Sequence, residues 1–406
     1  MARDLQAVLN FGAIDADADN LLRECFQEHP AYLLARDNAR FLVLGRKGAG
    51  KTAIFQRLIK HRNHDYFAYG HSFDDYPWNH HDLQAQVGVP EERRYVHSWK
   101  YLTLISLCKL LLNHDQSQPW NNESQDSTAA LEDFIVDSYG SRDPDLSRLF
   151  TPDKELKLKG TLKVPFINLA GERIRIKDLP THIQEVNRAM EQHVIRSLHP
   201  DHWYYVCFDQ LDLGFTLTDP KYAQRLIGLI LAARDLFIAG KDAERHLNVV
   251  VFLRDDIYQD LQFEDKNKIS ENYSTLVSWS EKAGGLTLKQ LMERRFNEVI
   301  GTPDDRVEWD AVFDEEKQMP SRQTKYKHIV DRTFLRPRDM IKFCNEVLDQ
   351  YKQQSGSQYS KFDNAAVHQA RDGYSEYLLN ELDDEIAKHV PAYKEYLEVV
   401  KELGGV

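Results

Sequence analysis

The segment from residue 45 to residue 52 constrains the fold more than any other part of the chain. It has the pattern G-x-x-x-x-G-K-[ST] and consists of Gly45, Arg46, Lys47, Gly48, Ala49, Gly50, Lys51 and Thr52. In this pattern, backbone N–H groups of a Gly-rich turn and the start of a helix form a cradle for phosphate. The Lys51 ammonium would reach the β- and γ-phosphates, and the Thr52 hydroxyl would coordinate Mg²⁺. The pattern therefore predicts binding of a nucleoside triphosphate with Mg²⁺.

The residues on both sides of this loop fit a strand–loop–helix unit. The apolar run 41–44 is typical of a buried strand, and residues 53–59 have the pattern of a helix. We therefore expect an α/β fold, in which helices flank a parallel sheet that carries the phosphate loop. No guanine-reading N-K-x-D sequence lies near the expected loops, which favours ATP over GTP.

Composition excludes several other classes of protein. A net charge of −12 on 406 residues argues against a chain that binds polyanions over its whole surface. Cys25, Cys108, Cys207 and Cys344 lie far apart without a C-x-x-C pair, so neither a disulfide framework nor a zinc ribbon is expected. The longest apolar stretch, 226–233, is well short of the ~18 residues that span a bilayer. With no signal-peptide pattern at the N-terminus, we expect a cytoplasmic protein without membrane contact.

Changes in pattern along the chain predict its organisation. We expect a helical N-terminal segment (1–40), a nucleotide-binding core (41–300) with an insert at about 140–180, and a helical lid (301–406). In the first segment, Asp15, Asp17 or Asp19 is expected to cap a helix. The polar stretch 116–127 is expected to be a surface loop.

A second apolar run is expected to bring a carboxylate to the phosphate loop. Residues 203–208 form this run, and Asp209 follows it, where it would bind Mg²⁺ directly or through water. The next acid is Asp212, and two readings of it stay open. It could orient the attacking water, or it could cap the following helix.

A third apolar strand, 248–253, ends at Arg254. Carboxyl ends of parallel strands open on the ligand crevice, so this cation could reach the γ-phosphate. The alternative is an ion pair with Asp255 or Asp256.

The insert contains a basic β-hairpin at 156–177. Apolar residues alternate there with six cations, which together with one acid give a local charge of +5. The cations are Lys157, Lys159, Lys163, Arg173, Arg175 and Lys177. This face is either simply solvated or a contact surface for nucleic acid or an acidic partner.

Three motifs together resemble a known family. They are Gly-Arg-Lys-Gly-x-Gly-Lys-Thr at 45–52, Phe-Asp-x-Leu-Asp at 208–212 and Arg-Pro-Arg-Asp-x-Ile-x-Phe-x-Asn at 336–345. The set resembles bacterial P-loop ATPases of the STAND or AAA+-like type, which are often encoded near defence and mobile elements. The resemblance implies that Asp212 activates water and that Arg254 acts as sensor I. It also implies that Arg338, or Arg336, couples phosphate state to the lid, although both could instead be surface arginines.

These features predict a Mg²⁺-dependent ATP-binding and ATP-hydrolysing switch that acts on a partner or effector. The resemblance adds bacterial antiviral defence as the expected setting. Arg294 or Arg295 could serve as an arginine finger on a neighbouring subunit, or could be an ordinary surface arginine. The alternatives are a nucleotide-gated nucleic-acid-binding protein that uses the basic hairpin and, less favoured, a small-molecule kinase.

Overall fold

A parallel sheet forms the centre of the protein. The computed structural model describes residues 5–73, 79–85, 89–146, 149–150, 155–157, 173–212, 220–279, 286–302, 305–320, 322–354, 360–386, 390 and 392–403. Five strands form the sheet in the order β2-β5-β6-β1-β7, and all of their pairings are parallel. These strands are β1 Leu42–Gly45, β2 Tyr66–Ser72, β5 Trp203–Asp209, β6 His246–Arg254 and β7 Ser274–Leu276. The predicted α/β fold is confirmed.

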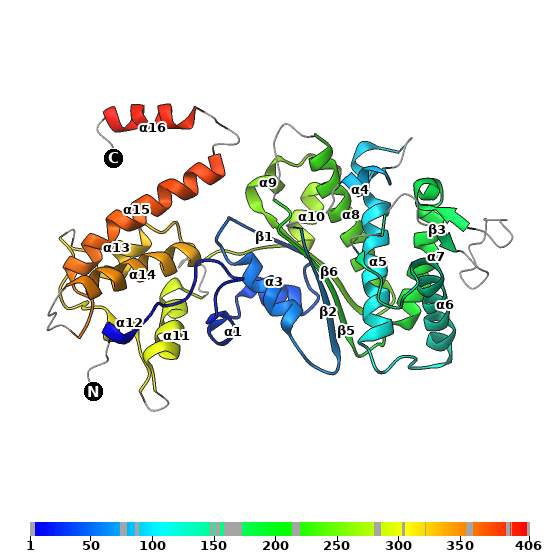
Figure 1. The fold of residues 1–406 in the computed structure, drawn as a ribbon, viewed down its shortest axis with the longest axis horizontal. Coiled ribbons are helices and arrows are strands. Elements are labelled where there is room, and N and C mark those ends of the chain that lie inside the picture. The colour runs from blue at the N-terminus through cyan, green and yellow to red at the C-terminus, as the bar shows by residue number, and fades with distance from the viewer. Residues whose placement is uncertain are drawn as a thin grey trace.

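Helices surround this sheet and continue beyond it (Figure 1). The described helices are η1 Leu5–Ala7, α1 Leu22–Cys25, α2 Pro30–Arg36, α3 Lys51–Lys60, α4 Asn79–Asp82, η2 Glu91–Arg93, α5 Val96–Asn113, α6 Asn122–Tyr139, η4 Ile176–Thr181, α7 Ile183–Ser197, α8 Pro220–Asp242, α9 Asp255–Asp260, α10 Lys266–Tyr273, α11 Leu288–Ile300, α12 Trp309–Val312, α13 Lys325–Val330, α14 Pro337–Gln353, α15 Asn364–Ile386 and α16 Tyr393–Glu402. Among these described helices, none combines the length and apolar character needed to cross a bilayer.

Both faces of the sheet are buried. Val43 and Tyr205 belong to a cluster on one face that includes side chains of α2 and α3. Leu44 and Phe208 belong to a larger cluster on the other face, which includes side chains of α5, α7 and α8. Since successive strand residues point to opposite faces, burial on both sides explains why these strands are continuous apolar runs.

The strand order sets which chain segments meet at the ligand edge. β6 lies between β1 and β5, and Gly45 at the end of β1 is level with Arg254 at the end of β6. Asp209 at the end of β5 pairs with Ser72 of β2. The carboxyl ends of these four strands therefore lie along one edge.

The described residues between β2 and β5 are mostly helical, and the expectation of a surface loop at 116–127 needs correction. Residues 122–127 belong to α6 and not to a surface loop, because Asn121 caps the helix: its side chain accepts from the Ser124 backbone N–H at 2.7 Å. The Ser124 hydroxyl oxygen accepts from the Asn121 N–H in return, at 2.9 Å. α5 is buried almost all round between α6, α7 and α8.

A short antiparallel pair lies in the insert where the basic hairpin is expected. β3 (Glu155–Lys157) pairs with β4 (Arg173–Arg175), and Leu156 is opposite Ile174. Leu156 is fully buried in the large core cluster, as the alternating pattern predicts for its apolar face. The turn between these two strands lies outside the described residues.

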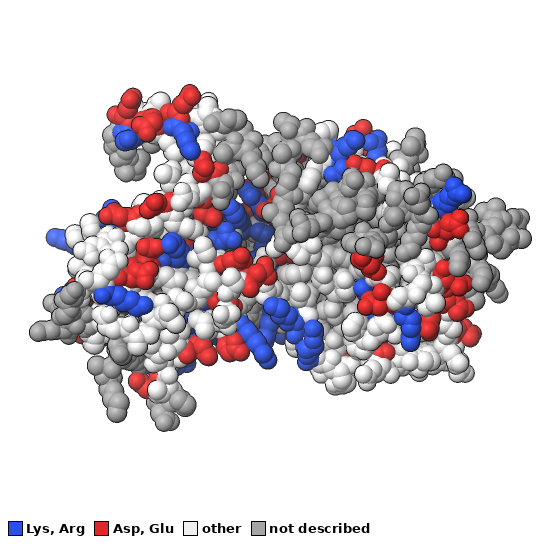
Figure 2. All heavy atoms as spheres, viewed as in Figure 1, with Lys and Arg blue, Asp and Glu red and all other residues white. Residues whose placement is uncertain are grey.

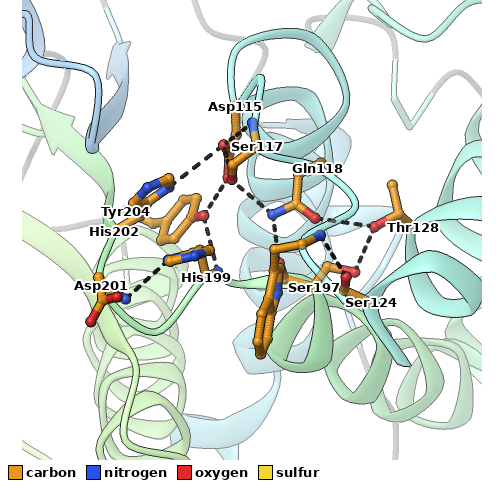
Figure 3. Close-up of polar contacts among 11 residues, drawn as sticks. Asp115, Ser117, Gln118, Ser124, Thr128, Ser197, His199, Asp201, His202 and Tyr204 are labelled. Carbon is orange, nitrogen blue, oxygen red and sulfur yellow. Dashed lines mark hydrogen bonds and ion pairs between the residues drawn. The ribbon is translucent and has the colours of Figure 1, made fainter. Parts of the chain in front are cut away.

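A polar network joins the segment after α5 to the end of α7 and the start of β5 (Figure 3). The buried Asp115 carboxylate accepts from the Ser117 backbone N–H, the Gln118 amide and the Tyr204 hydroxyl, at 3.0, 3.0 and 2.5 Å. Gln118 also donates to the Ser197 carbonyl at the end of α7, at 2.7 Å. The network thus joins the segment after α5, the end of α7 and β5 at the edge opposite the phosphate loop.

The C-terminal helices have a core of their own, at the opposite end of the molecule from α5–α7 (Figure 1). This core includes residues of α11, before the boundary at residue 301 that the sequence pattern suggested, because Leu288, Met292 and Phe296 pack with α14. The N-terminal segment joins the same core through Leu5 and Phe11. Its described residues form only three short helices, η1, α1 and α2, so the segment is less helical than expected. α2 packs against the sheet, so the segment contacts both halves of the protein.

Candidate functional site

The loop after β1 has the backbone geometry that its glycines predict. Gly48 and Gly50 have φ values of 76° and 102°, in the left-handed region that favours glycine. A Cβ atom on Gly50 would meet nothing within 4 Å, so the backbone conformation, and not lack of space, favours glycine at this position. α3 begins at Lys51, directly after the loop. The loop lines a cavity of about 470 Å³ together with α3, the end of β5, the N-terminal segment and the C-terminal helices.

Lys51 is held inside this loop. Its ammonium donates to the carbonyl oxygens of Gly45 and Arg46, at 2.8 and 3.1 Å. Burial lowers the pKa of Lys51, while the negative charges of Asp212 and Asp209 act in the opposite direction. The predicted phosphate-binding lysine and both predicted acids line the same cavity.

Asp209 has the clearest signature of a ligand-binding group. It is 3% exposed, and burial raises its pKa to about 6 although a hydrogen bond with Thr52 and the charge of Lys51 lower it. Its Oδ2 atom is buried without a hydrogen-bond partner among the described residues. An orphaned carboxylate oxygen beside a threonine hydroxyl is chemically suited to Mg²⁺, which prefers hard oxygen ligands. The residues present fit this ion.

Asp212 and Arg254 lie together at the ends of β5 and β6. The Arg254 Nη1 atom is 3.8 Å from Asp212 Oδ2. The same guanidinium donates to Asp256 at 3.0 Å (Nε to Oδ1) and 2.5 Å (Nη2 to Oδ2), so the ion pair left open in the sequence does form. The alternative that Asp212 caps the following helix concerns residues 213–219, which lie outside the described residues.

Gln210 connects the end of β5 to the N-terminal segment. Its φ of 59° is in the left-handed region, and its side chain accepts from the Ser72 hydroxyl. The Gln210 amide also lies 3.5 Å from Asp17, which in turn accepts from Gln56 of α3. The expectation that Asp15, Asp17 or Asp19 caps a helix is not met, because α1 has no side-chain cap at Leu21 and His29 caps α2. Asp17 instead bridges two side chains beside the cavity.

Arg336 and Arg338 have different roles. Arg336 pairs with the buried Asp339 (Nε to Oδ2, 2.5 Å) and donates to the Lys47 carbonyl at 3.3 Å. Arg338 lines the cavity directly and packs against Gly48, where an added Cβ would be 3.1 Å from the Arg338 Cβ atom. Of the two, Arg338 is therefore the arginine placed to meet a ligand.

Arg294 and Arg295 are tied to the N-terminal segment. Arg295 is 4% exposed, pairs with Asp19 at 2.6 Å and donates to the Phe11 carbonyl at 2.9 Å. Because this arginine is buried inside its own chain, it does not serve as a finger for a neighbouring subunit. Arg294 is exposed and donates to the Phe26 carbonyl at 2.8 Å.

The far wall of the cavity is apolar. It contains Ile14, Leu22, Phe26, Val277, Trp279 and Ile341. The Trp279 indole N–H donates to the Ala49 carbonyl at 2.9 Å, which fixes this ring behind the phosphate loop. An apolar wall beside an anion cradle could hold the base of a nucleotide.

Sequence patterns missed this wall because it comes from three distant parts of the chain. Asn345, which belongs to the third motif, is the one motif residue that could have pointed to the N-terminal part of this wall. Its side chain accepts from the Phe11 N–H at 2.8 Å and donates to the Gly12 carbonyl at 2.9 Å. This asparagine thus fixes the N-terminal segment to α14.

The structure describes little of the predicted basic surface, and over the described residues of the face drawn in Figure 2 the basic side chains are interspersed with acidic ones. Arg175 is exposed and lies 3.9 Å from Glu155. The side chains of the other five cations lie outside the described residues: Lys157, Lys159, Lys163, Arg173 and Lys177. The proposed nucleic-acid contact stays a prediction.

Fold and site together define an α/β protein with a helical C-terminal region and a Gly-rich loop at the ligand edge of its sheet. Residues 286–383 match the model of the FunZ-associated C-terminal helical domain, which corresponds to α11–α15. This comparison identifies no P-loop family for the sheet. No curated protein and no solved structure matches the chain.

Proposed function

We propose that this protein is a switch that binds and hydrolyses ATP with Mg²⁺. The observation that supports the proposal best is the orphaned Oδ2 atom of Asp209, buried beside Thr52 and Lys51. A buried carboxylate oxygen without a donor is costly unless a ligand pairs with it. The phosphate-loop geometry in front of it supports a phosphate-bearing ligand as the source of that pairing.

The residues of the loop would bind and orient the triphosphate. The Lys51 ammonium would offset phosphate charge, since its contacts with two loop carbonyls already hold it in the cradle. Thr52 and Asp209 would hold Mg²⁺, which when bound neutralises charge on the phosphate oxygens. Asp212 would orient the attacking water, and Arg254 beside it would respond to charge on the terminal phosphate.

The position of Arg338 supports a switch as well as an enzyme. Its backbone N–H lies 3.4 Å from the Gly48 carbonyl, so α14 begins in contact with the phosphate loop. A ligand in the loop would therefore change contacts made by the C-terminal helices. We propose that these helices pass the nucleotide state to a partner, and the resemblance suggests an effector in antiviral defence.

The role of Asp212 gives a direct test. Asp212→Asn should bind ATP within a few-fold of the unchanged protein but lower turnover about 100-fold or more, because a water-orienting carboxylate is lost. Phosphate release and calorimetric affinity would be measured side by side. Asp260→Asn is the control, since Asp260 is an exposed acid in nearby α9.

Normal turnover in Asp212→Asn would move the catalytic role to another group. Absence of phosphate release in the unchanged protein, with binding intact, would reduce the proposal to a nucleotide-binding protein.

A further inference from the structure

Glu381 places a third acid at the phosphate loop, in addition to those at the strand ends. It lies on α15 and lines the same cavity as the loop. Its Oε2 atom is 3.2 Å from Arg338 Nη1 and 3.5 Å from Lys47 Nζ. One carboxylate oxygen therefore joins a cation of the loop to a cation of α14.

Both cations are placed to receive phosphate. Lys47 belongs to the loop itself, and Arg338 packs against Gly48 in that loop. The Arg338 Nε atom is also buried without a hydrogen-bond partner among the described residues, so this guanidinium has a donor left to give. A phosphate that contacts either cation would come close to the Glu381 carboxylate, and two like charges would share one cation pair.

The three side chains are only partly exposed, at 17% for Glu381, 24% for Arg338 and 27% for Lys47. At such burial, solvent screens the charges less than at an open surface. Competition between Glu381 and a phosphate for the two cations would therefore change the affinity for nucleotide. Glu381 cannot remain fully paired when a triphosphate takes the same cations.

We propose that Glu381 is an internal competitor that sets how tightly the phosphate loop holds a nucleotide. This inference rests on the proposed binding of ATP. The carboxylate and the phosphates exchange places on Lys47 and Arg338, so nucleotide binding separates this part of α15 from the loop. The contact thereby couples phosphate binding to the last part of the helical region.

The test compares three forms of the full chain: unchanged, Glu381→Gln and Glu376→Gln. Glu376 is the matched control, because it is an exposed glutamate on the same helix. Calorimetry with Mg²⁺ and the β,γ-imido analogue of ATP measures binding without turnover. Removing a competing charge should tighten binding about tenfold, whereas the control should stay within about twofold. Glu381→Ala should show the same direction of change.

Thermal unfolding without nucleotide separates competition from a purely structural role. We expect the thermal midpoint of Glu381→Gln to be equal to or slightly below that of the unchanged protein, since two partly exposed ion pairs are lost. Tighter binding by a protein that is no more stable is the signature of a removed competitor.

Equal or weaker binding by Glu381→Gln, with normal binding by the other two forms, would overturn the competition and leave ATP binding intact. If none of the three forms binds the analogue, the proposed function itself fails, and the competition fails with it.

Discussion

Two buried carboxylates lie near opposite ends of β5, and their surroundings differ. Asp115 is 5% exposed, and donors from three residues, Ser117, Gln118 and Tyr204, satisfy its two oxygens. Asp209 is 3% exposed, and one of its oxygens has no hydrogen-bond partner among the described residues. The first group stabilises the fold, and the second is costly until a ligand pairs with it.

The pKa values of the two groups move in opposite directions. Burial acts to raise the pKa of Asp115, but hydrogen bonds from Ser117, Tyr204 and Gln118 outweigh it and lower the pKa. For Asp209, burial outweighs the contributions of Thr52 and Lys51, and the pKa rises to about 6. Similar solvent exposure thus goes with opposite pKa shifts, because Asp115 has more donors and Asp209 lies deeper in the protein, where desolvation is stronger.

The largest expected effect is the loss of the satisfied carboxylate. Asp115→Ala should lower the free energy of unfolding by about 4 kcal/mol, because it leaves the buried Tyr204 hydroxyl and the Gln118 amide short of a partner. Thermal unfolding followed by circular dichroism measures the loss. Affinity for ATP of the folded fraction should not change, since Asp115 lies at the edge opposite the loop. A stability change below about 1 kcal/mol would mean that Asp115 does not stabilise the fold more than Asp209 does, and would remove the contrast between them.

The opposite change is expected for Asp209. Asp209→Asn should raise the free energy of unfolding without nucleotide by about 2 kcal/mol at pH 8, because a buried charge is removed. The same substitution should weaken binding of Mg²⁺ with ATP, since a ligand of the ion is lost. Loss of stability in this variant would mean that the carboxylate already has sufficient partners.

The pH dependence sharpens this contrast further. Because the folded pKa of Asp209 is raised from 3.8 to about 6, its charged form costs stability above pH 6, and the cost disappears as the pH falls towards 3.8. The stability gain of Asp209→Asn should therefore shrink to nearly nothing by about pH 4. The folded pKa of Asp115 is lowered, so its contribution is present above its ordinary value of 3.8 and is lost only as the pH falls below it. Thermal midpoints between pH 4 and pH 8 would measure the change at Asp209, and midpoints below pH 3.8 would measure the loss at Asp115. If the stability gain of Asp209→Asn does not vary with pH, its cause would be packing and not the removal of a charge.

Local patterns were sufficient for three of the five strands of the sheet and for part of the site. Continuous apolar runs predicted β1, β5 and β6, since strands covered on both faces have little polar alternation. The position of Asp209 and Arg254 beside the Gly-rich loop is predictable because all three follow the carboxyl ends of strands in one parallel sheet. The carboxyl ends of parallel strands meet at one edge, wherever they lie in the sequence.

The rest of the site depends on contacts that no local pattern encodes. Glu381 meets Lys47 across more than 330 residues of sequence, and Asp19 meets Arg295 across 276. An isolated glutamate on an α-helix has the same sequence signature whether it faces solvent or a phosphate loop. The start of α6 was missed for a different reason: its capping residues are polar, and in composition alone they resemble a loop.

Calorimetry of ATP binding with Mg²⁺, on the unchanged protein and on Lys51→Ala, tests the central claim most directly. We predict measurable heat and one site per chain for the unchanged protein, and no binding for Lys51→Ala, because the cation that faces the phosphates is gone. Heat that is the same in both proteins, or absent with every triphosphate tried, would contradict the account.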